Sequence, residues 1–362
     1  MPAKKRYLFL DVLRIIAITE MIHGHTLDAL LSPVLRSAGF FAWWTPVRGY
    51  TAPLFLFAAG FAFAIATLPR QHAFQSFTQQ FWRRLKRILF IILIGYLMYL
   101  PYFSLWKTIQ TIGSPGWQSL LSVDILRCIG VSLLTLQLWY LLRVPDAVTV
   151  IVFSCAALFL PLLTPLVQDS RIIAGLPDVM RYYFVGSRFP LVFYSSYLFL
   201  GFITGYAFLR SRISWIWGVT GAGFIMIIVA YLLKQAGVLW TLSVFLNKGG
   251  IFLLLTAACE RAETYWRRLP AAVRILGQES FIIYVVHVFV LYGSFLNPGL
   301  RHIFGTELVY RGVYGVFLWL LVAMGVMGYI WNRIKHESPD AGKFIRYFLY
   351  VGFIVLFLSR PF

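Results

Sequence analysis

The sequence predicts an all-α integral membrane protein that crosses the bilayer many times. Of its 362 residues, 60% are hydrophobic and only 12% are charged. A soluble domain of this size needs far more polar residues to cover its surface. Apolar runs of about 18 residues or more recur along the whole chain, as expected of membrane-spanning helices. Lys and Arg are also unevenly distributed between the connecting segments.

Eleven stretches are candidates for spans: 8–30, 50–68, 88–104, 121–142, 147–165, 190–209, 214–234, 238–258, 276–294, 309–331 and 345–360. The N-terminal tail MPAKKR leads into the first stretch without a nearby small-residue cleavage site, which predicts an uncleaved first span. We find no soluble domain, heptad array or low-complexity tract. We therefore expect one transmembrane domain over residues 1–362.

The net charge of +19 would suggest nucleic-acid binding in a soluble protein. Here it follows the positive-inside rule, which predicts no nucleic-acid partner. Counting from an inside N-terminus, 19 of the 32 Lys and Arg fall in cytoplasmic segments, ten fall outside and three lie within spans. This bias predicts an N-inside, C-outside orientation. The three cysteines lie in apolar segments and are interpreted as packing residues, not metal ligands.

The first span carries ionisable residues that lipid would exclude, and such residues usually face a partner or a wet cavity. At 100° per residue, Asp11, Arg14, His25 and Asp28 share one face, whereas Glu20 and His23 do not. Arg14 and His25 lie about 16 Å apart along the axis, at 1.5 Å per residue. This arrangement suits a long substrate that enters from the cytoplasm and reacts deeper in the membrane.

Histidine can accept a proton or carry an acyl group, because its ordinary pKa lies near neutrality. Asp28, one turn from His25, could orient the imidazole as in other His–Asp pairs. The alternative is a buried histidine bonded to a carbonyl or a water. Arg14 could bind a phosphate or an amide of a donor, or form a structural pair with Asp11. Both interpretations of Arg14 remain open.

The stretch "LDVLRIIAITEMIHGHT" resembles the opening helix of the transmembrane acyltransferases, in which a basic residue precedes a histidine by ten intervening residues. Arg14 and His25 match that spacing, and Asp11 matches the acidic residue before it. Three further stretches are similar to motifs of acyltransferase family 3: "RGYTAPLFLFAAGFAFA" (48–64), "FWRRLKR" (81–87) and "LGQESFIIYVVHVFV" (276–290).

The resemblance implies transfer of an acyl group, with acetyl the expected one, from cytoplasmic acyl-CoA to a hydroxyl or amine of an extracytoplasmic or lipid-linked glycan. It implies acyl-CoA as donor substrate and no metal. "DILRCIGV" (124–131) and the number of spans look closer to the heparan α-glucosaminide N-acetyltransferase-like branch. That branch's animal member has its active histidine in the first external loop. Residues 29–49 contain none, so the reactive role would fall to His25.

Further candidate residues lie outside the first span. His287 and Tyr284 share a face of the 276–294 stretch, at a spacing of three. His287 is a candidate catalytic partner or a packing residue, and Tyr284 a candidate for the acceptor. The remaining candidates are basic or paired residues: for the donor nucleotide Arg83, Arg84 and Arg87, and for the acceptor Arg48, Asp124, Arg127 and, in the aromatic segment 166–189, Arg188.

The main alternative function is a secondary transporter or flippase in which the buried Asp, Arg and His residues form a relay. Paired broken helices in two halves would favour it, but the only internal similarity is between 11–18 and 124–131. The expected location is a bacterial inner membrane. The sequence leaves open the acceptor, O- against N-acylation, the acyl length and the oligomeric state.

Overall fold

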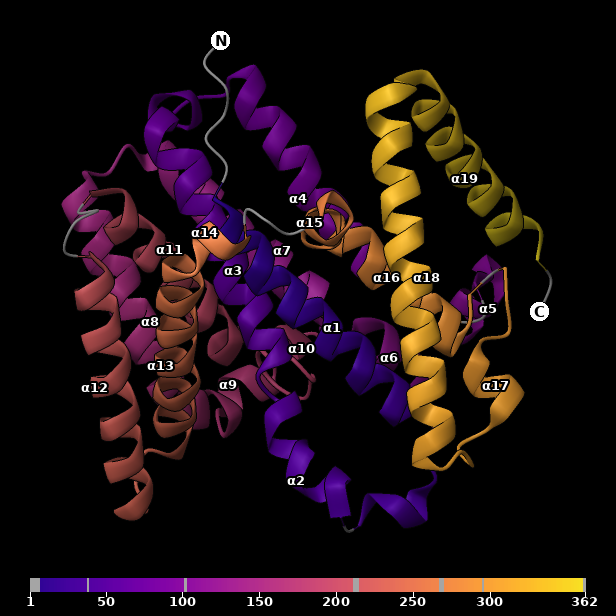
Figure 1. The fold of residues 1–362 in the computed structure, drawn as a ribbon, viewed down its shortest axis with the longest axis horizontal. Helices are drawn as coiled ribbons and strands as arrows, with labels where there is room; N and C mark the ends of the chain where they lie inside the picture. The colour runs from indigo at the N-terminus through magenta and orange to yellow at the C-terminus, as the bar shows by residue number, and fades with distance from the viewer. Residues whose placement is uncertain are drawn as a thin grey trace. The chain divides into compact units, whose positions relative to one another are not determined.

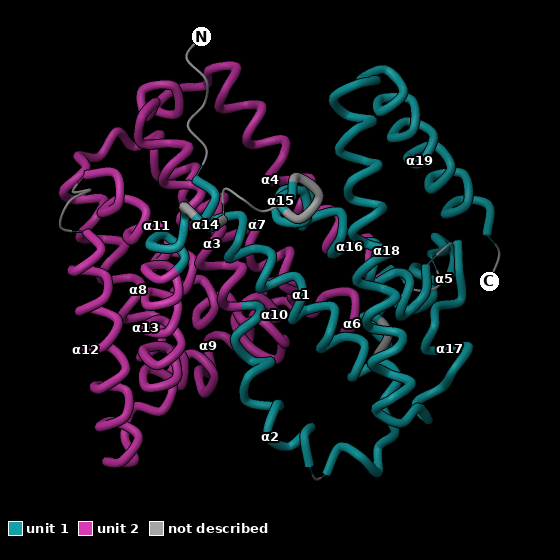
Figure 2. The backbone as a smooth tube through the Cα atoms, viewed as in Figure 1, with its two compact units in different colours: residues 1–52, 100–117, 259–362 teal, residues 53–99, 118–258 magenta. Residues whose placement is uncertain are grey.

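The computed structural model describes residues 7–37, 39–100, 103–210, 215–266, 270–294 and 296–360. Within these ranges the protein is helical and has no strand, which confirms the all-α membrane class (Figure 1). Two compact units are formed, each from segments far apart in the sequence (Figure 2). Unit 1 comprises residues 1–52, 100–117 and 259–362, and unit 2 comprises residues 53–99 and 118–258.

Unit 1 is built around the first helix of the chain. Its helices are α1 (Leu8–Leu30), η1 (Pro33–Arg36), α2 (Gly39–Arg48), α5 (Leu105–Gln110), α14 (Glu263–Trp266), α15 (Ala271–Gln278), α16 (Ser280–Tyr292), α17 (Leu300–Phe304), α18 (Tyr310–Glu337) and α19 (Pro339–Ser359). The helix α6 (Pro115–Leu121) is divided between the two units.

Unit 2 contains the middle of the chain. Its helices are α3 (Thr51–Thr67), η2 (Leu68–Phe74), α4 (Gln79–Leu97), α7 (Ile125–Trp139), η4 (Tyr140–Leu142), α8 (Asp146–Gln168), α9 (Arg171–Ala174), α10 (Asp178–Phe184), α11 (Leu191–Arg210), α12 (Trp215–Gln235) and α13 (Trp240–Arg261). The segments 105–120 and 166–189, which lie between predicted spans, thus contain the short helices α5, α6, α9 and α10.

Eight helical segments of the described chain are long and apolar enough to cross a membrane: Gly39–Phe74, Trp117–Leu142, Asp146–Gln168, Leu191–Arg210, Trp215–Gln235, Trp240–Arg261, Tyr310–Glu337 and Pro339–Ser359. The other three predicted spans fall on α1, α4 and α16. Charges interrupt α1 and the start of α4, and α16 has 13 residues, fewer than the roughly 20 that span a bilayer. The number of eleven and the orientation remain predictions.

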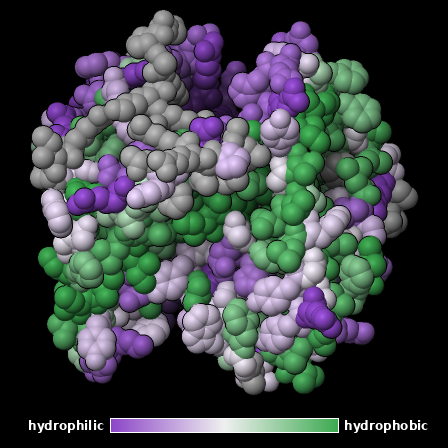
Figure 3. Space-filling view, in the orientation of Figure 1, coloured by the Kyte–Doolittle hydropathy of each residue, from purple (hydrophilic) through white to green (hydrophobic). Residues whose placement is uncertain are grey.

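Bulky apolar side chains cover the outer faces of several of these helices (Figure 3). On α18, Leu318, Val322 and Val326 recur every four residues and are more than half exposed. On α12, Phe224 and Ile228 are similarly exposed. A face of this kind needs an apolar environment, and lipid provides it. The protein is therefore a multi-pass integral membrane protein.

The helix α1 lies at the centre of unit 1 and packs against α15, α16 and α18. Its contact with α15 is close, because a Cβ at Gly277 would lie 2.5 Å from the Asp11 carbonyl oxygen. At its other end, the Ser32 amide donates to the Leu308 carbonyl, and the Leu308 amide donates to the Leu30 carbonyl, both at 3.0 Å. This backbone bridge fixes the end of α1 that carries His25.

Candidate active site

Two histidines from distant parts of the sequence lie side by side in unit 1. His25 is half-buried near the end of α1, and His287 is fully buried on α16. Their ring centroids are 5.3 Å apart and the planes are inclined at 66°. The structure thus brings together two of the residues that the sequence identified as catalytic candidates.

The hydrogen bond of His287 defines its tautomer. Its Nδ1 lies 2.9 Å from the Ile283 carbonyl oxygen, one turn earlier on α16. Because a carbonyl can only accept, Nδ1 is the donor and Nε2 carries the lone pair in the neutral ring. Among the described residues no group forms a hydrogen bond with this buried Nε2. A buried nitrogen in this condition is costly, so it is a candidate for a functional role.

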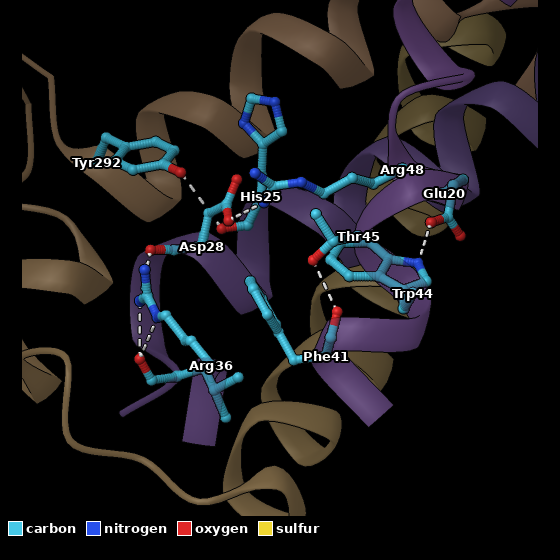
Figure 4. A network of polar contacts seen from close by, with 10 residues as sticks. Glu20, His25, Asp28, Arg36, Phe41, Trp44, Thr45, Arg48 and Tyr292 are labelled. Atoms are coloured by element: carbon cyan, nitrogen blue, oxygen red, sulfur yellow. Dashed lines mark hydrogen bonds and ion pairs between the residues drawn. The ribbon is translucent and has the colours of Figure 1, made fainter. Parts of the chain in front are cut away.

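Two tyrosines of α16 flank the histidine pair. The Tyr292 ring lies 5.9 Å from the His25 ring, and its hydroxyl donates to the His25 carbonyl at 3.3 Å (Figure 4). Tyr284 is buried, with its ring 5.7 Å from the ring of His287. Tyr284 therefore packs against the buried His287. Tyr292, which the sequence analysis did not single out, packs against His25 and is exposed.

Asp28 is directed to a different partner from the one predicted for it. Its carboxylate forms an ion pair with Arg48 of α2, and both side chains are more than a third exposed (Figure 4). Its carbonyl accepts from Arg36 at 3.1 Å. The Arg48 guanidinium also lies 5.7 Å from the Phe41 ring centre. Asp28 thus connects α1 with α2, and its predicted role beside His25 remains a prediction.

Arg14 lies about three turns and Asp11 about four turns from His25 on the same helix. Arg14 Nη1 is 3.6 Å from Asp11 Oδ1; Asp11 is buried, and the Arg14 side chain is 29% exposed. The close approach of Gly277 holds α15 against the backbone of Asp11. The pair is therefore formed, and Arg14 still has surface available for a ligand.

In unit 2 the basic residues of α4 divide into two kinds. Arg83 and Arg87 are exposed, as a phosphate-binding role requires. Arg84 instead donates to Thr67 Oγ1 at 2.6 Å, and its guanidinium lies 3.4 Å from the Phe74 ring centre. Arg84 thus joins α4 to the end of α3, which favours a structural role.

Asp124 and Arg127 form a buried pair at the start of α7. Asp124 caps the helix, since its Oδ1 accepts from the Arg127 amide at 3.0 Å and from Arg127 Nε at 2.9 Å. Arg127 Nη1 donates to the Leu120 carbonyl, and the guanidinium lies over the Tyr96 ring. Arg127 is fully buried, whereas Arg188, another candidate for the acceptor, is exposed.

The geometry around α1 agrees with a comparison against protein families. Residues 7–331 match the family model described as an acyltransferase domain, that of acyltransferase family 3. The chain belongs to this family. No curated protein shows significant similarity to the chain. The match concerns the family as a whole, so the likeness to the heparan α-glucosaminide N-acetyltransferase branch remains a prediction.

In the structure of this acyltransferase, two of the sequence motifs that resemble the family lie against each other. Gly277 and His287 both belong to the 276–290 stretch, and the structure places them against Asp11 and His25 of α1. In the described part of the chain, no three His, Cys, Asp or Glu side chains gather as metal ligands would.

Sequence analysis of this acyltransferase missed a second cluster on α1. His23 Nδ1 lies 3.4 Å from a Glu20 carboxylate oxygen, and the other Glu20 oxygen accepts from Trp44 Nε1 at 2.6 Å. The rings of Trp44 and Tyr314 pack against the His23 imidazole. The i, i+3 spacing of Glu20 and His23 in an apolar run was the available signal. This cluster attaches α2 and α18 to α1.

A third cluster joins α16 to α18. The buried Glu279 accepts hydrogen bonds from Asn332 at 2.8 Å and from Lys335 at 2.5 Å. The partners lie more than 50 residues away, so no local spacing could have identified them. Removing Lys335 would leave the buried Glu279 carboxylate without its cation, which is strongly destabilising.

Proposed function

We propose that this acyltransferase moves an acyl group, acetyl in the first instance, from cytoplasmic acyl-CoA to a hydroxyl or amine of an extracytoplasmic or lipid-linked glycan. The observation that carries the proposal is the His25–His287 pair, formed by two helices of one unit and located three turns from Arg14. We place the protein in a bacterial inner membrane.

In the proposed reaction His25 acts as the general base. The acceptor oxygen or nitrogen attacks the thioester carbonyl, and its proton passes to a ring nitrogen of His25. The new C–O or C–N bond forms as the C–S bond breaks, and the proton is returned to the departing sulfur of CoA. A variant of this mechanism passes the acyl group through His25 itself, with the same overall balance.

Arg14 and the exposed cations of α4 are the proposed donor contacts. Arg14 is only 29% exposed and lies about 16 Å along α1 from His25. This distance requires an extended donor, with its polar part near Arg14 and its thioester near His25. Arg83 and Arg87 offer guanidinium groups suited to nucleotide phosphates. Arg84 is left out of this proposal because its guanidinium already contacts Thr67 and Phe74.

The test is acyl transfer by the purified full-length protein. Labelled acetyl-CoA is supplied with a glycan mixture, and release of CoA and transfer of label are measured. His25→Ala should reduce turnover at least about 100-fold, the lower range for loss of a general base. The matched control is His336→Ala, because His336 is exposed at the end of α18 and bonds only within its own helix to the Asn332 carbonyl.

Two results would contradict the proposal. One is an unchanged rate of acyl transfer in folded His25→Ala. The other is the absence of CoA release from the native protein with any acceptor, which would direct attention to transport by the relay of buried ionisable residues. Label retained on His25 after denaturation would distinguish the acyl-histidine variant from direct transfer.

A further inference from the structure

A second guanidinium, that of Arg301, lies near the His25 end of the candidate site, where it contacts Tyr292. The Arg301 guanidinium carbon lies 5.9 Å from the centre of the Tyr292 ring, and that ring lies 5.9 Å from the ring of His25. Arg301 is exposed, on the short helix α17. A guanidinium placed over an aromatic face keeps its in-plane N–H donors available to an anion.

The loop between α16 and α17 is built to hold Arg301 in this position. Gly293 and Gly299 both have positive φ, at 99° and 86°. A Cβ at Gly299 would lie 2.3 Å from the Gly293 nitrogen. The backbones at the two ends of the loop are therefore in direct contact. Asn297 donates to the Phe289 carbonyl at 3.0 Å and closes the loop onto α16. This geometry returns α17 over Tyr292.

The positive-inside rule does not explain the positive charge at the end of unit 1 that carries His25. In the segments predicted to lie outside, together with the outer ends of the adjoining spans, unit 1 has six cations against two anions, Asp28 and Glu307. The cations are Arg36, Arg48, Lys107, Arg301, Arg311 and Arg360. The positive-inside rule concentrates Lys and Arg on the other side, so an external excess has another cause. A bound anion is the simplest one.

Arg48 contributes less to this excess than Arg301. It is already paired with Asp28 (Figure 4), so the charge of the two together is close to zero. Arg36 similarly donates to the carbonyls of Asp28 and Leu31. Arg301 contacts a neutral ring and keeps its full charge, which makes it the cation near His25 best suited to an anionic ligand.

We propose that the acceptor carries an anionic group, a phosphate or a carboxylate, next to the hydroxyl or amine that is acylated, and that Arg301 binds it. The inference rests on the proposed function and specifies the class of its acceptor. Arg301 and His25 both lie 5.9 Å from the centre of the Tyr292 ring, so an acceptor held by Arg301 would be anchored on the side of the site where its proton must be removed.

Binding of three sugars to the purified full-length protein tests the inference. Glucose 1-phosphate, glucuronate and glucose are compared by calorimetry at low salt, so that the result does not depend on turnover. At least one anionic sugar should bind about tenfold more tightly than glucose, because a hydrogen-bonded charge pair contributes this order of affinity. Which of the two anionic sugars binds more tightly shows whether the group is a phosphate or a carboxylate.

Two variants assign this preference to Arg301. Arg301→Gln should remove it, whereas Arg301→Lys should retain part of it. Arg360→Gln is the matched control, since it removes an exposed cation of the same unit on α19, which packs against α18 and α5. Release of CoA from acetyl-CoA in the presence of the glycan mixture is measured in parallel for the native protein and for His25→Ala.

The inference fails if glucose binds as tightly as both anionic sugars, if neither anionic sugar binds, or if Arg360→Gln lowers the preference as much as Arg301→Gln. Each of these results leaves the proposed function in place if acetyl-CoA is still cleaved in a His25-dependent manner. Loss of cleavage in the native protein would instead contradict the proposed function.

Discussion

The buried Nε2 of His287 makes this residue a candidate for a chemical role beyond packing. Its Nδ1 is committed to the Ile283 carbonyl, and its buried Nε2 has no hydrogen-bond partner in the described chain. In the mechanism proposed above, an N–H of His25 needs an acceptor that fixes the ring while the opposite nitrogen takes the proton. We propose that His287 supplies this acceptor and acts as a positioning residue.

Replacement of His287 by phenylalanine tests this role, because the ring is kept and the nitrogens are removed. We expect kcat to fall about 100-fold, in the range of general-base effects, while KM for acetyl-CoA changes little. His287→Gln, whose amide oxygen can accept near the position of Nε2, should restore part of kcat. Steady-state kinetics on both variants provides the measurement. Equal losses in the two variants would indicate that the residue only packs.

Asp28 shows the limit of helical spacing at the scale of a residue. Spacing placed Asp28 one turn from His25, which is correct along α1. It could not include Arg48, because that side chain lies on α2, a helix in the segment between the first two predicted spans. A carboxylate next to an available guanidinium pairs with it, so a partner from another element took precedence over a neighbour on the same helix.

Close glycine contacts determine how several helices of unit 2 pack. A Cβ at Gly60 of α3 would lie 1.9 Å from the Leu198 carbonyl oxygen, and one at Gly201 of α11 would lie 1.9 Å from the Phe57 carbonyl oxygen. These two glycines therefore let the backbones of α3 and α11 meet. Small residues commonly serve this purpose between membrane helices, where packing takes the place of the hydrophobic effect.

Gly95 of α4 provides an element-scale prediction. A Cβ there would lie 2.8 Å from Arg127 Cγ and 2.9 Å from Asp124 Oδ1. Gly95→Ala should therefore separate α4 from the capped start of α7 and lower the free energy of unfolding by about 1–3 kcal/mol, as overpacking does. Denaturant or thermal unfolding in detergent measures the change.

Gly221→Ala on α12 is the control for this substitution. No atom outside its own helix lies within 4 Å of the added methyl group, and alanine is favoured over glycine in a helix by about 0.5–1 kcal/mol. Gly221→Ala should therefore be neutral or slightly stabilising. A stable Gly95→Ala protein would show that the Asp124–Arg127 pair can move aside at little cost.

At the scale of the whole molecule, the number of spans decides the positions of the two ends. Eleven spans place the N-terminus and the C-terminus on opposite sides, whereas eight would place them on the same side. We predict that a reporter active only outside the cytoplasm will be active after Phe362. The same reporter inserted after Gln75 should be inactive. Inactivity after Phe362 would contradict the odd number of spans, and activity after Gln75 would contradict the inside N-terminus.

Much of the architecture could be predicted from the sequence, because lipid imposes long apolar helices whatever their neighbours are. The first span was placed at 8–30, and α1 is Leu8–Leu30. The pairing of His25 with His287 was not predictable in the same way: 262 positions separate them, and only the packing of α1 against α16 joins them. The Glu279–Lys335 contact was missed for the same reason.

The bridge between Leu30, Ser32 and Leu308 has a practical consequence for following motion of the protein. Because its hydrogen bonds use only backbone atoms, the side chain at position 308 can be exchanged while the attachment is kept. A cysteine at position 308 would carry a spin label on the backbone bridge next to the end of α1 that contains His25. Cys128 and Cys259 are buried and Cys155 is exposed, so a Cys155→Ser background would restrict the label to the chosen position. The label would then report directly whether the outer end of α1 shifts when a donor or an acceptor is added.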